Sequence, residues 1–396
     1  MLDMTADGLE VRTFRSLEEL QTIMSDWEDL LANYPLATTF STSEWLISWW
    51  RSFGKDQELL AVGFFSDSRL VALALLSIDR FRCAKTFSLR RLRLMGDGSK
   101  DSDNLDLPVL PGYEEKFAES LLRFLETEGR SWDFAELNTL PEYSPAASAL
   151  RQSLGRINWP TIEKQRPASA IALPAGWEEY LRSLASEDQK NLARYTRRLE
   201  KRYAVQIYRC SAESQLAKCL EALFEHHQAR WEAAGERGSF GSRERIDFYY
   251  ELSRSLLPQQ RLDLWVLELD GIVVAAQFGF RYGRQVFQLQ EGNAPKHAPD
   301  RVGFVLRGHV MKQLIADGVQ IYDFLGGDLG YKARWGAQAR GYTDIHFARP
   351  RSLGGAYLQA VHRAAQSKAW LRKTLPQPAW DVLHKIHLHF RPGVDE

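Results

Sequence analysis

A short segment near residue 330 gathers side chains that could carry acid–base chemistry. A predicted strand ends in Gly326-Gly327 and a brief polar helix is predicted to follow, a position where open α/β sheets often bind ligands. Group transfer to an amine or hydroxyl needs a base that takes the acceptor's proton and an acid that protonates the leaving group. The candidates are Asp323 or Asp328 as the base, Tyr331 as the acid, Lys332 as a phosphate or oxyanion ligand and Trp335 as an acceptor contact, with Glu291 as a rival base. In a purely structural interpretation, Asp328 caps the short helix, Lys332 is solvated and Trp335 packs in the core.

A second candidate site is the start of the helix predicted over residues 302–317. The first turn of a helix has unpaired backbone N–H groups, and the helix dipole favours an anion there. Asp300, Arg301, Val302 and Gly303 would form a cradle for a pyrophosphate. A glycine near a helix start is common, so an ordinary helix N-terminus remains the alternative.

The helix predicted over residues 187–202 has a basic face. The residues Lys190, Arg194, Arg197, Arg198 and Lys201 recur at spacings that place them on one side of the helix. Such a face is ordinarily solvated. The alternative is a binding surface for a phosphate group, an anionic glycan or tRNA, although stacking aromatics do not interleave with the basic residues.

The helix predicted over residues 213–234 carries His226 and His227 next to each other. Adjacent histidines cannot share a helix face, so they do not form the i, i+4 pair that binds zinc. We expect His227 to be buried and hydrogen-bonded. Arg230 and Trp231, one turn later, could border a groove for the acceptor.

Four aspartates between two predicted elements resemble a calcium loop. The string Asp97, Asp101, Asp103 and Asp106 lacks the terminal glutamate and the full D-x-D-x-D-G order of an EF-hand. We therefore expect a solvated loop rather than a cation site.

The order of predicted elements indicates a mixed α/β fold with two units. Each half contains an apolar strand pair meeting at a polar turn, at residues 59–78 and 261–280, followed by a further strand and a helix, so a duplication is plausible. An N-cap at Ser16 predicts a helix reaching residue 32. A capping box at Ser41 and Glu44 predicts another over residues 42–53. Prolines 141, 145, 160 and 167 indicate a domain crossing, which gives domains at residues 1–160 and 161–350 and a helical tail at 351–396.

Composition fits a globular chain and excludes several classes. Of 396 residues, 44% are hydrophobic and 26% are charged, and 51 basic residues balance 51 acidic ones, so no global field attracts nucleic acid or anionic lipid. The three cysteines lack CxxC spacing, and no apolar run resembles a signal peptide or a membrane span. These features predict a cytoplasmic protein. In the tail, His384, His387 and His389 have a metal-like spacing, but a packed helix or a basic amphipathic membrane contact is the preferred interpretation.

Several stretches, in order, resemble one family. They are VAAQFGF, VFQLQEGN, RVGFVLRGHVMKQLIADG and IYDFLGGDLGYKARWG in the C-terminal half, and FSTSEWLISWWRSFG and RLRLMGDGSKDSDNLDLPV in the N-terminal half. Together they cover most of residues 36–340 and resemble the GNAT-fold acyltransferases associated with bacterial cellulose and exopolysaccharide synthesis.

The resemblance implies two tandem GNAT-like domains, each a mixed, mostly antiparallel sheet flanked by helices. The second domain would bind acetyl-CoA or another acyl-CoA, without a metal, and transfer the acyl group directly to an amine or hydroxyl of a sugar, nucleotide-sugar or lipid-linked glycan. A membrane polysaccharide synthase is the implied partner, at the inner membrane. By this resemblance the donor site comprises Gln290, Arg301, Val302, Gly303, Phe304 and Lys332, and the acceptor site comprises Arg230, Trp231 and Trp335.

Two alternatives stay open. The glycine-rich signature of ordinary GNAT enzymes is reduced here to residues 301–304, and related tandem-GNAT enzymes of the peptidoglycan-branching Fem type use aminoacyl-tRNA as the donor. A non-catalytic scaffold of a polysaccharide synthase is the other alternative. No GxSxG motif or evident Cys–His pair supports covalent catalysis.

Overall fold

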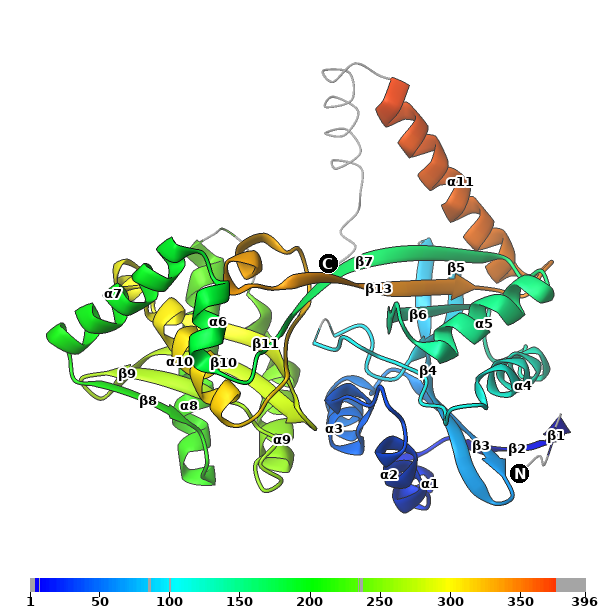
Figure 1. Cartoon of the computed structure of the whole chain (residues 1–396). Coiled ribbons are helices and arrows are strands. Elements are labelled where there is room, and N and C mark those ends of the chain that lie inside the picture. The colour runs from blue at the N-terminus through cyan, green and yellow to red at the C-terminus, as the bar shows by residue number, and fades with distance from the viewer. Residues whose placement is uncertain are drawn as a thin grey trace.

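One mixed sheet of 13 strands runs through the residues described by the computed structural model, which are 4–6, 8–84, 87–99, 101–233, 235 and 238–374 (Figure 1). Its strand order is β1-β2-β3-β4-β5-β6-β13-β7-β12-β11-β10-β9-β8. Two neighbouring pairs, β5 with β6 and β11 with β12, are parallel. The other neighbouring pairs in this sheet are antiparallel.

The N-terminal half supplies one end of the sheet and the helices that cover it. Its strands are β1 (Met4–Ala6), β2 (Leu9–Phe14), β3 (Glu58–Ser66), β4 (Arg69–Ala84), β5 (Phe87–Leu94) and β6 (Phe134–Pro141). Its helices are α1 (Leu17–Gln21), α2 (Met24–Ala32), η1 (Thr39–Ser41), α3 (Ser43–Phe53), α4 (Glu114–Thr127) and α5 (Pro145–Arg156).

The C-terminal half supplies the other end. Its strands are β7 (Thr161–Ala172), β8 (Val205–Arg209), β9 (Trp265–Leu269), β10 (Ile272–Tyr282), β11 (Gln285–Asn293), β12 (Ile321–Gly326) and β13 (Gln338–Phe347). Its helices are α6 (Trp177–Ser183), α7 (Ser186–Arg202), α8 (Glu213–Ala233), η2 (Ser239–Gly241), α9 (Arg243–Leu256), η3 (Pro295–Asp300), α10 (Val302–Ala316), η4 (Gly330–Trp335) and α11 (Leu353–Thr374).

The two halves repeat one arrangement. An antiparallel hairpin, β3-β4 or β9-β10, is followed by an antiparallel strand, a helix and a strand that pairs in parallel with the one before the helix. The repeat is consistent with the duplication indicated by the sequence. It also places α4 and α10, and the parallel pairs β5-β6 and β11-β12, in equivalent positions.

Two long strands, β7 and β13, join the halves into one sheet. β13 lies between β6 and β7, and β7 lies between β13 and β12. Figure 1 shows β7 and β13 running side by side from one half to the other. The hydrophobic core crosses the same boundary, because the Phe40 and Trp45 rings lie 5.3 and 5.0 Å from the Phe280 ring. The halves are therefore joined by backbone pairing and by packing.

The predicted helix starts need two corrections. Ser16 is an N-cap as predicted, since its side chain accepts a hydrogen bond from the Glu19 N–H, but the helix breaks after Gln21 and α2 begins at Met24. The cap of α3 is Thr42, which accepts from the Trp45 N–H, and not Ser41, which belongs to the preceding 3-10 turn. In both cases the hydrophobic pattern located the helix, and the local turn fixed its first residue.

Three elements in and after the proline-containing stretch at residues 141–167 were not predicted from the sequence. Pro145 opens α5 with Ser144 as its N-cap, because proline is well tolerated in the first helical turn. β7, which contains Pro167, and α9 were also not predicted. The C-terminal helix α11 extends away from the rest of the molecule in Figure 1, with Leu358 buried near its start. His384, His387 and His389 lie outside the described residues. None of the described helices has the length and apolar character needed to cross a membrane.

Candidate functional site

The turn that ends β12 is held by a buried lysine. Leu325 has a φ of 61° and Gly327 a φ of 104°, so the chain turns sharply here and exposes its amides and carbonyls to side chains. Lys332 Nζ donates to the carbonyl oxygens of Phe324 (3.3 Å) and Gly326 (2.9 Å), and burial lowers the pKa of its ammonium group. Lys332 is therefore not solvated, and its contacts fix the shape of the turn.

Asp323 lies on the other side of the same turn. Its carboxylate is 4% exposed, its Oδ1 accepts from the Leu325 N–H at 2.7 Å, and its Oδ2 is 4.0 Å from Arg340 Nη1. Burial raises the pKa of Asp323 to about 6. At neutral pH the group is mostly ionised and has a higher proton affinity than an ordinary aspartate, which suits a general base.

A carboxylate from the N-terminal half joins this turn. Asp103 Oδ2 accepts from the Gly326 N–H at 2.9 Å, so Asp103 and Asp323 bind consecutive backbone amides. Burial raises the pKa of Asp103 as well. Sequence reasoning placed Asp103 only in the acidic string, because its partner is 223 positions away.

The rest of the acidic string is not solvated, which corrects the expectation of a solvated loop. Asp97 accepts from Arg93 and from Asn138 Nδ2 (2.8 Å). Asp101, 1% exposed, accepts from Arg245 Nε and Tyr249 Oη, each at 3.0 Å. Asp106 accepts from the Tyr34 hydroxyl and, at 2.7 Å, from Ser144 Oγ. Each carboxylate has its own protein partners, and the loop connects the two halves.

Glu291, the rival base, lies between two arginines. Arg307 Nη2 pairs with Glu291 Oε2, and Arg230 Nη1 lies 3.6 Å from Oε1. Arg307 is 4% exposed, and its guanidinium carbon lies 5.3 Å from the centre of the Tyr331 ring. The structure therefore brings Glu291, Arg230 and Tyr331 together. Both oxygens of Glu291 are thus engaged by cations of the protein itself.

Tyr331 and Asp328 are exposed, whereas Trp335 is not. Burial of part of the Tyr331 side chain, with the negative charge of Glu291, raises the pKa of its phenol, so the phenol stays protonated at neutral pH. Asp328 is exposed on the turn before η4. Trp335 is 3% exposed with its ring 4.8 Å from that of Phe304, which is the core packing of the structural alternative.

The N-terminus of α10 has no side-chain cap. Arg301 precedes it in the left-handed conformation (φ 58°), and the Asn293 side chain covers Gly303 so closely that a Cβ there would lie 2.3 Å from Asn293 Oδ1. The unpaired amides of this turn could bind an anion. Asp300 does not belong to the cradle, because its buried carboxylate pairs with Arg202 (2.8 Å), Arg198 (3.2 Å) and His297 (3.1 Å).

The strands before and after α10 in the chain, β11 and β12, are paired over only part of their length. β11 and β12 pair in parallel only at residues 285–287 and 321–323, and β11 then bulges at Leu289 before reaching Gln290 and Glu291. A ligand at the start of α10 would meet the carboxyl ends of both strands, where open sheets bind ligands. Asp323 is the last residue of β12 that pairs with β11, opposite Phe287, and Gln290 follows three residues later in β11.

The adjacent histidines of α8 are both held by hydrogen bonds within the protein. His227 is buried and accepts a hydrogen bond from Trp231 Nε1 at 3.0 Å, as predicted, and burial lowers its pKa to about 4. His226 is hydrogen-bonded to the Val273 carbonyl at 2.9 Å. Arg230 lies over the Trp231 ring and reaches Glu291, so Arg230 borders the site while Trp231 is held by His227.

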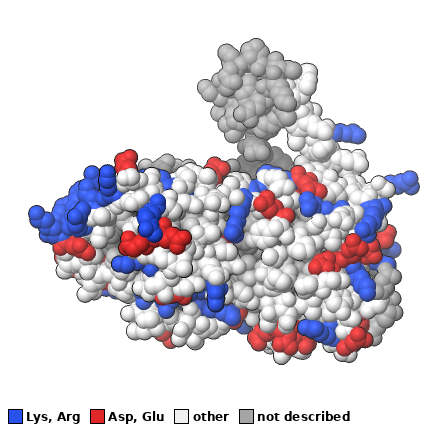
Figure 2. Space-filling model, viewed as in Figure 1, with Lys and Arg blue, Asp and Glu red and all other residues white. Residues whose placement is uncertain are grey.

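The basic face of α7 is partly used within the protein. Arg198 and Arg202 pair with Asp300. Lys190, Arg194, Arg197 and Lys201 are exposed, and Figure 2 shows a group of basic side chains at the end of the molecule that α7 occupies in Figure 1. Within the described residues, no group of three or more His, Cys, Asp or Glu side chains could hold a metal ion.

Comparison with known families identifies the C-terminal part of the chain. Residues 186–333, which contain α7 to α10, β12 and the turn after it, match the family model of the acetyltransferase (GNAT) domain. This segment is therefore similar to the acetyltransferase (GNAT) domain. No curated protein matches the sequence at a significant level.

Solved structures with the same fold extend over most of the chain. The crystal structure of FemX aligns with a TM-score of 0.62 at 10% identity, covering 88% of this chain and 99% of FemX. The C-terminal domain of a putative lysylphosphatidylglycerol synthetase from Agrobacterium fabrum aligns with a TM-score of 0.50 at 12% identity, covering 87% and 96%. L-PGS from Bacillus licheniformis has the same score and identity, covering 86% and 95%. The predicted fold class, two GNAT-like mixed α/β units, is confirmed.

Proposed function

We propose that this protein is an acyltransferase that moves the acyl group of acetyl-CoA or another acyl-CoA to an amine or hydroxyl of a sugar or glycan-related acceptor. The observation that supports it most is the match of residues 186–333 to the acetyltransferase (GNAT) domain. That segment contains the uncapped start of α10 and Asp323, the two features that the reaction needs. The resemblance of the sequence to exopolysaccharide-associated enzymes supports the acceptor class.

The donor's pyrophosphate would bind the backbone amides of Val302 and Gly303 at the start of α10, beside Phe304, whose own N–H donates to the Arg301 carbonyl at 3.0 Å. Arg301 is exposed beside them and adds a positive charge. The acyl end of the donor would then lie at the carboxyl ends of β11 and β12, with Gln290 on one side and Asp323 on the other. Binding there would place the thioester near the turn after β12, which Asp103 of the N-terminal half also contacts.

Transfer would proceed in one step within a ternary complex. Asp323 takes a proton from the acceptor, the acceptor's N or O bonds to the thioester carbon, and the C–S bond breaks. The leaving thiolate takes a proton from Tyr331, whose raised pKa keeps it protonated beforehand. Lys332 contributes by holding the turn that carries Asp323.

Replacement of Gly303 by Glu tests the donor site. A side chain there displaces Asn293 and puts a negative charge at the helix start, so we expect saturable stabilisation by acetyl-CoA in thermal-shift and calorimetric titrations of the wild type and its loss in Gly303→Glu. The control is Gly155→Glu in α5, where a Cβ meets no atom within 4 Å. No binding of any acyl-CoA to the wild type would contradict the proposal.

We also propose the location and partner that the family resemblance implies. The acceptor would be presented by a polysaccharide synthase, with the enzyme on the cytoplasmic side of the inner membrane. Co-purification of such a synthase with the tagged full-length protein would support this setting, and recovery of the protein alone from gently solubilised membranes would argue against it.

Aminoacyl-tRNA is a second candidate donor, favoured by the exposed basic residues of α7. If tRNA binds there, its affinity should fall steeply with salt, because binding releases counterions from the phosphates. We expect the double variant Arg194→Gln/Lys201→Gln to flatten the salt dependence measured by fluorescence anisotropy. Binding that is absent at low salt, or unchanged in the variant, would reject this alternative.

A further inference from the structure

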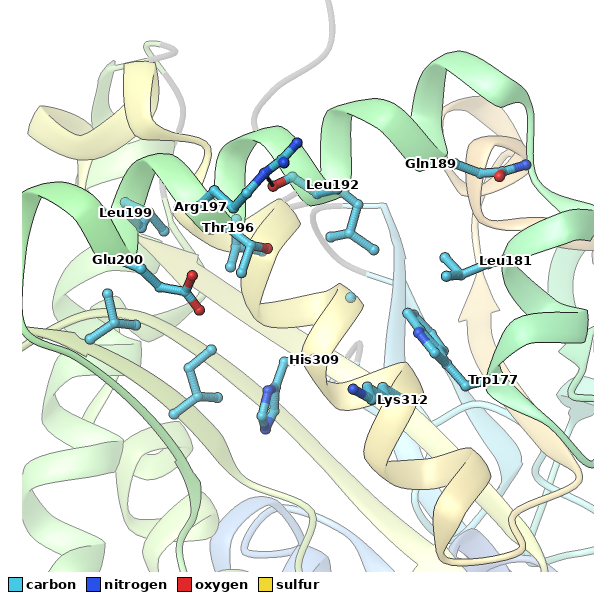
Figure 3. Close-up of a pocket in the computed structure, with 15 residues that line it drawn as sticks. Trp177, Leu181, Gln189, Leu192, Thr196, Arg197, Leu199, Glu200, His309 and Lys312 are labelled. Carbon is cyan, nitrogen blue, oxygen red and sulfur yellow. Dashed lines mark hydrogen bonds between the residues drawn. The ribbon is translucent and has the colours of Figure 1, made fainter.

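A cavity of about 550 Å³ lies between α7 and α10 (Figure 3), and Arg307 of α10 is not among the residues that line it. The two helices touch where Leu192 packs on Gly308, since a Cβ at Gly308 would lie 2.4 Å from Leu192 Cδ1. Beside this contact, α7 presents the small residues Ala193 and Thr196 to the cavity. The two helices are close together at this contact, but the small side chains next to it do not fill the space between them, which leaves the cavity.

The wall of the cavity is mostly apolar. Its volume lies in the range of about 300–1,000 Å³ typical of small-molecule sites. One side is formed by β8, the edge strand of the sheet, so the cavity opens at the end of the molecule, away from the turn that carries Asp323. The apolar lining includes Trp177, Leu181, Leu192, Val205, Ile207 and Val305. Such a wall suits an aliphatic chain, whose transfer from water is favourable for each buried methylene.

The polar residues of the cavity favour one negative charge. Lys312 is exposed beside Trp177 in Figure 3, and none of the ion pairs among the described residues engages it. Burial lowers the pKa of His309, which makes the imidazole a neutral group at pH 7. Arg197 and Glu200, both from α7, balance each other in charge. The net single positive charge matches a monoanion better than a diphosphate, which Glu200 would repel.

We propose that this cavity binds an aliphatic carboxylate, with the chain against the apolar wall and the carboxylate at Lys312. The site is separate from the proposed donor and acceptor sites and does not depend on them. A lysine–carboxylate contact at the mouth would provide orientation, because charge-assisted hydrogen bonds are stronger than neutral ones. The apolar wall would provide most of the affinity.

The test is a calorimetric titration of the full chain with decanoate and with the uncharged decanol. We expect decanoate to bind saturably, with an affinity about tenfold weaker in Lys312→Gln, whereas decanol binding is unchanged. Lys190→Gln, on the outer face of α7, is the matched control and should leave both affinities unchanged. Hexanoate should bind more weakly than decanoate, because fewer methylenes are buried.

Two further variants keep the result independent of overall stability. Thr196→Phe places a ring in the cavity and should abolish decanoate binding while the melting temperature stays close to that of the wild type. Trp177→Phe should remove the change in tryptophan fluorescence caused by decanoate while the heat of binding remains. The proposal is overturned if decanoate does not bind to the wild type, if Thr196→Phe binds it equally well, or if Lys312→Gln weakens decanoate and decanol alike.

Discussion

Replacing Asp323 by Asn should lower the rate of acyl transfer by about 10²–10⁴-fold, the usual contribution of a general base. The amide of Asn can still accept the Leu325 N–H bond that Asp323 makes, so the turn should keep its shape. The acyl-CoA affinity, measured by calorimetry, should therefore be unchanged while the rate of CoA release in the presence of acceptor falls.

Two matched variants separate Asp323 from the other candidate bases. Asp328→Asn changes an exposed carboxylate five residues later and should retain nearly full activity. Glu291→Gln removes a carboxylate that pairs with Arg307 and Arg230, so we expect a loss of stability with less effect on the chemical step. A loss of rate in Asp328→Asn or Glu291→Gln that matches the loss in Asp323→Asn would contradict our assignment.

The pH dependence follows from the raised pKa of Asp323. A base must be ionised, so activity should fall as the pH drops below about 6, and this fall should disappear in the residual activity of Asp323→Asn. The stability effect has the opposite sign. Because the folded-state pKa lies above the ordinary 3.8, the folded state holds this proton more tightly, and that contribution to stability is lost as the pH rises from about 4 through about 6. Denaturation of the wild type and Asp323→Asn at pH 4 and 7 measures this difference.

The local patterns of the sequence predicted most of the elements around the site. The strand pair predicted within residues 261–280, the helix from residue 302 and the strand ending at Gly326-Gly327 are all present, because hydrophobic periodicity and turn residues act over short distances. The candidate residues Asp323, Tyr331, Lys332 and Glu291 lie near that strand end as expected, since they follow directly from these elements.

Contacts between distant parts of the chain were beyond the reach of these patterns. Nothing local in the sequence shows that Asp103 binds the Gly326 N–H, or that Lys332 points inward to two carbonyls instead of to solvent. The insertion of β13 between β6 and β7 is likewise set by long-range pairing. Burial then determines the proton affinity of Asp323, and burial depends on all of these contacts.

Replacing Asp101 by Ala should destabilise the protein by about 3–5 kcal/mol, as expected when one partner of a buried ion pair is removed. Asp101 comes from the N-terminal half, is 1% exposed and accepts hydrogen bonds from Arg245 and Tyr249 of α9. Its loss leaves the Arg245 charge and the Tyr249 hydroxyl buried without this acceptor. The measurement is the free energy of unfolding from urea denaturation followed by circular dichroism.

The control for Asp101 is an aspartate–arginine pair on the surface of the same helix. Asp247 pairs with Arg243 at 2.9 Å, but both side chains are more than half exposed, so Asp247→Ala should cost less than about 1 kcal/mol. The double variant Asp101→Ala/Arg245→Ala should lose less stability than the sum of the single variants, because either change alone removes the pair. Additive losses, or a cost for Asp101→Ala as small as that for Asp247→Ala, would show that the acidic loop does not hold the halves together. A sub-additive loss would indicate that the Asp101–Arg245 pair anchors to α9 the loop from which Asp103 contacts the turn after Asp323.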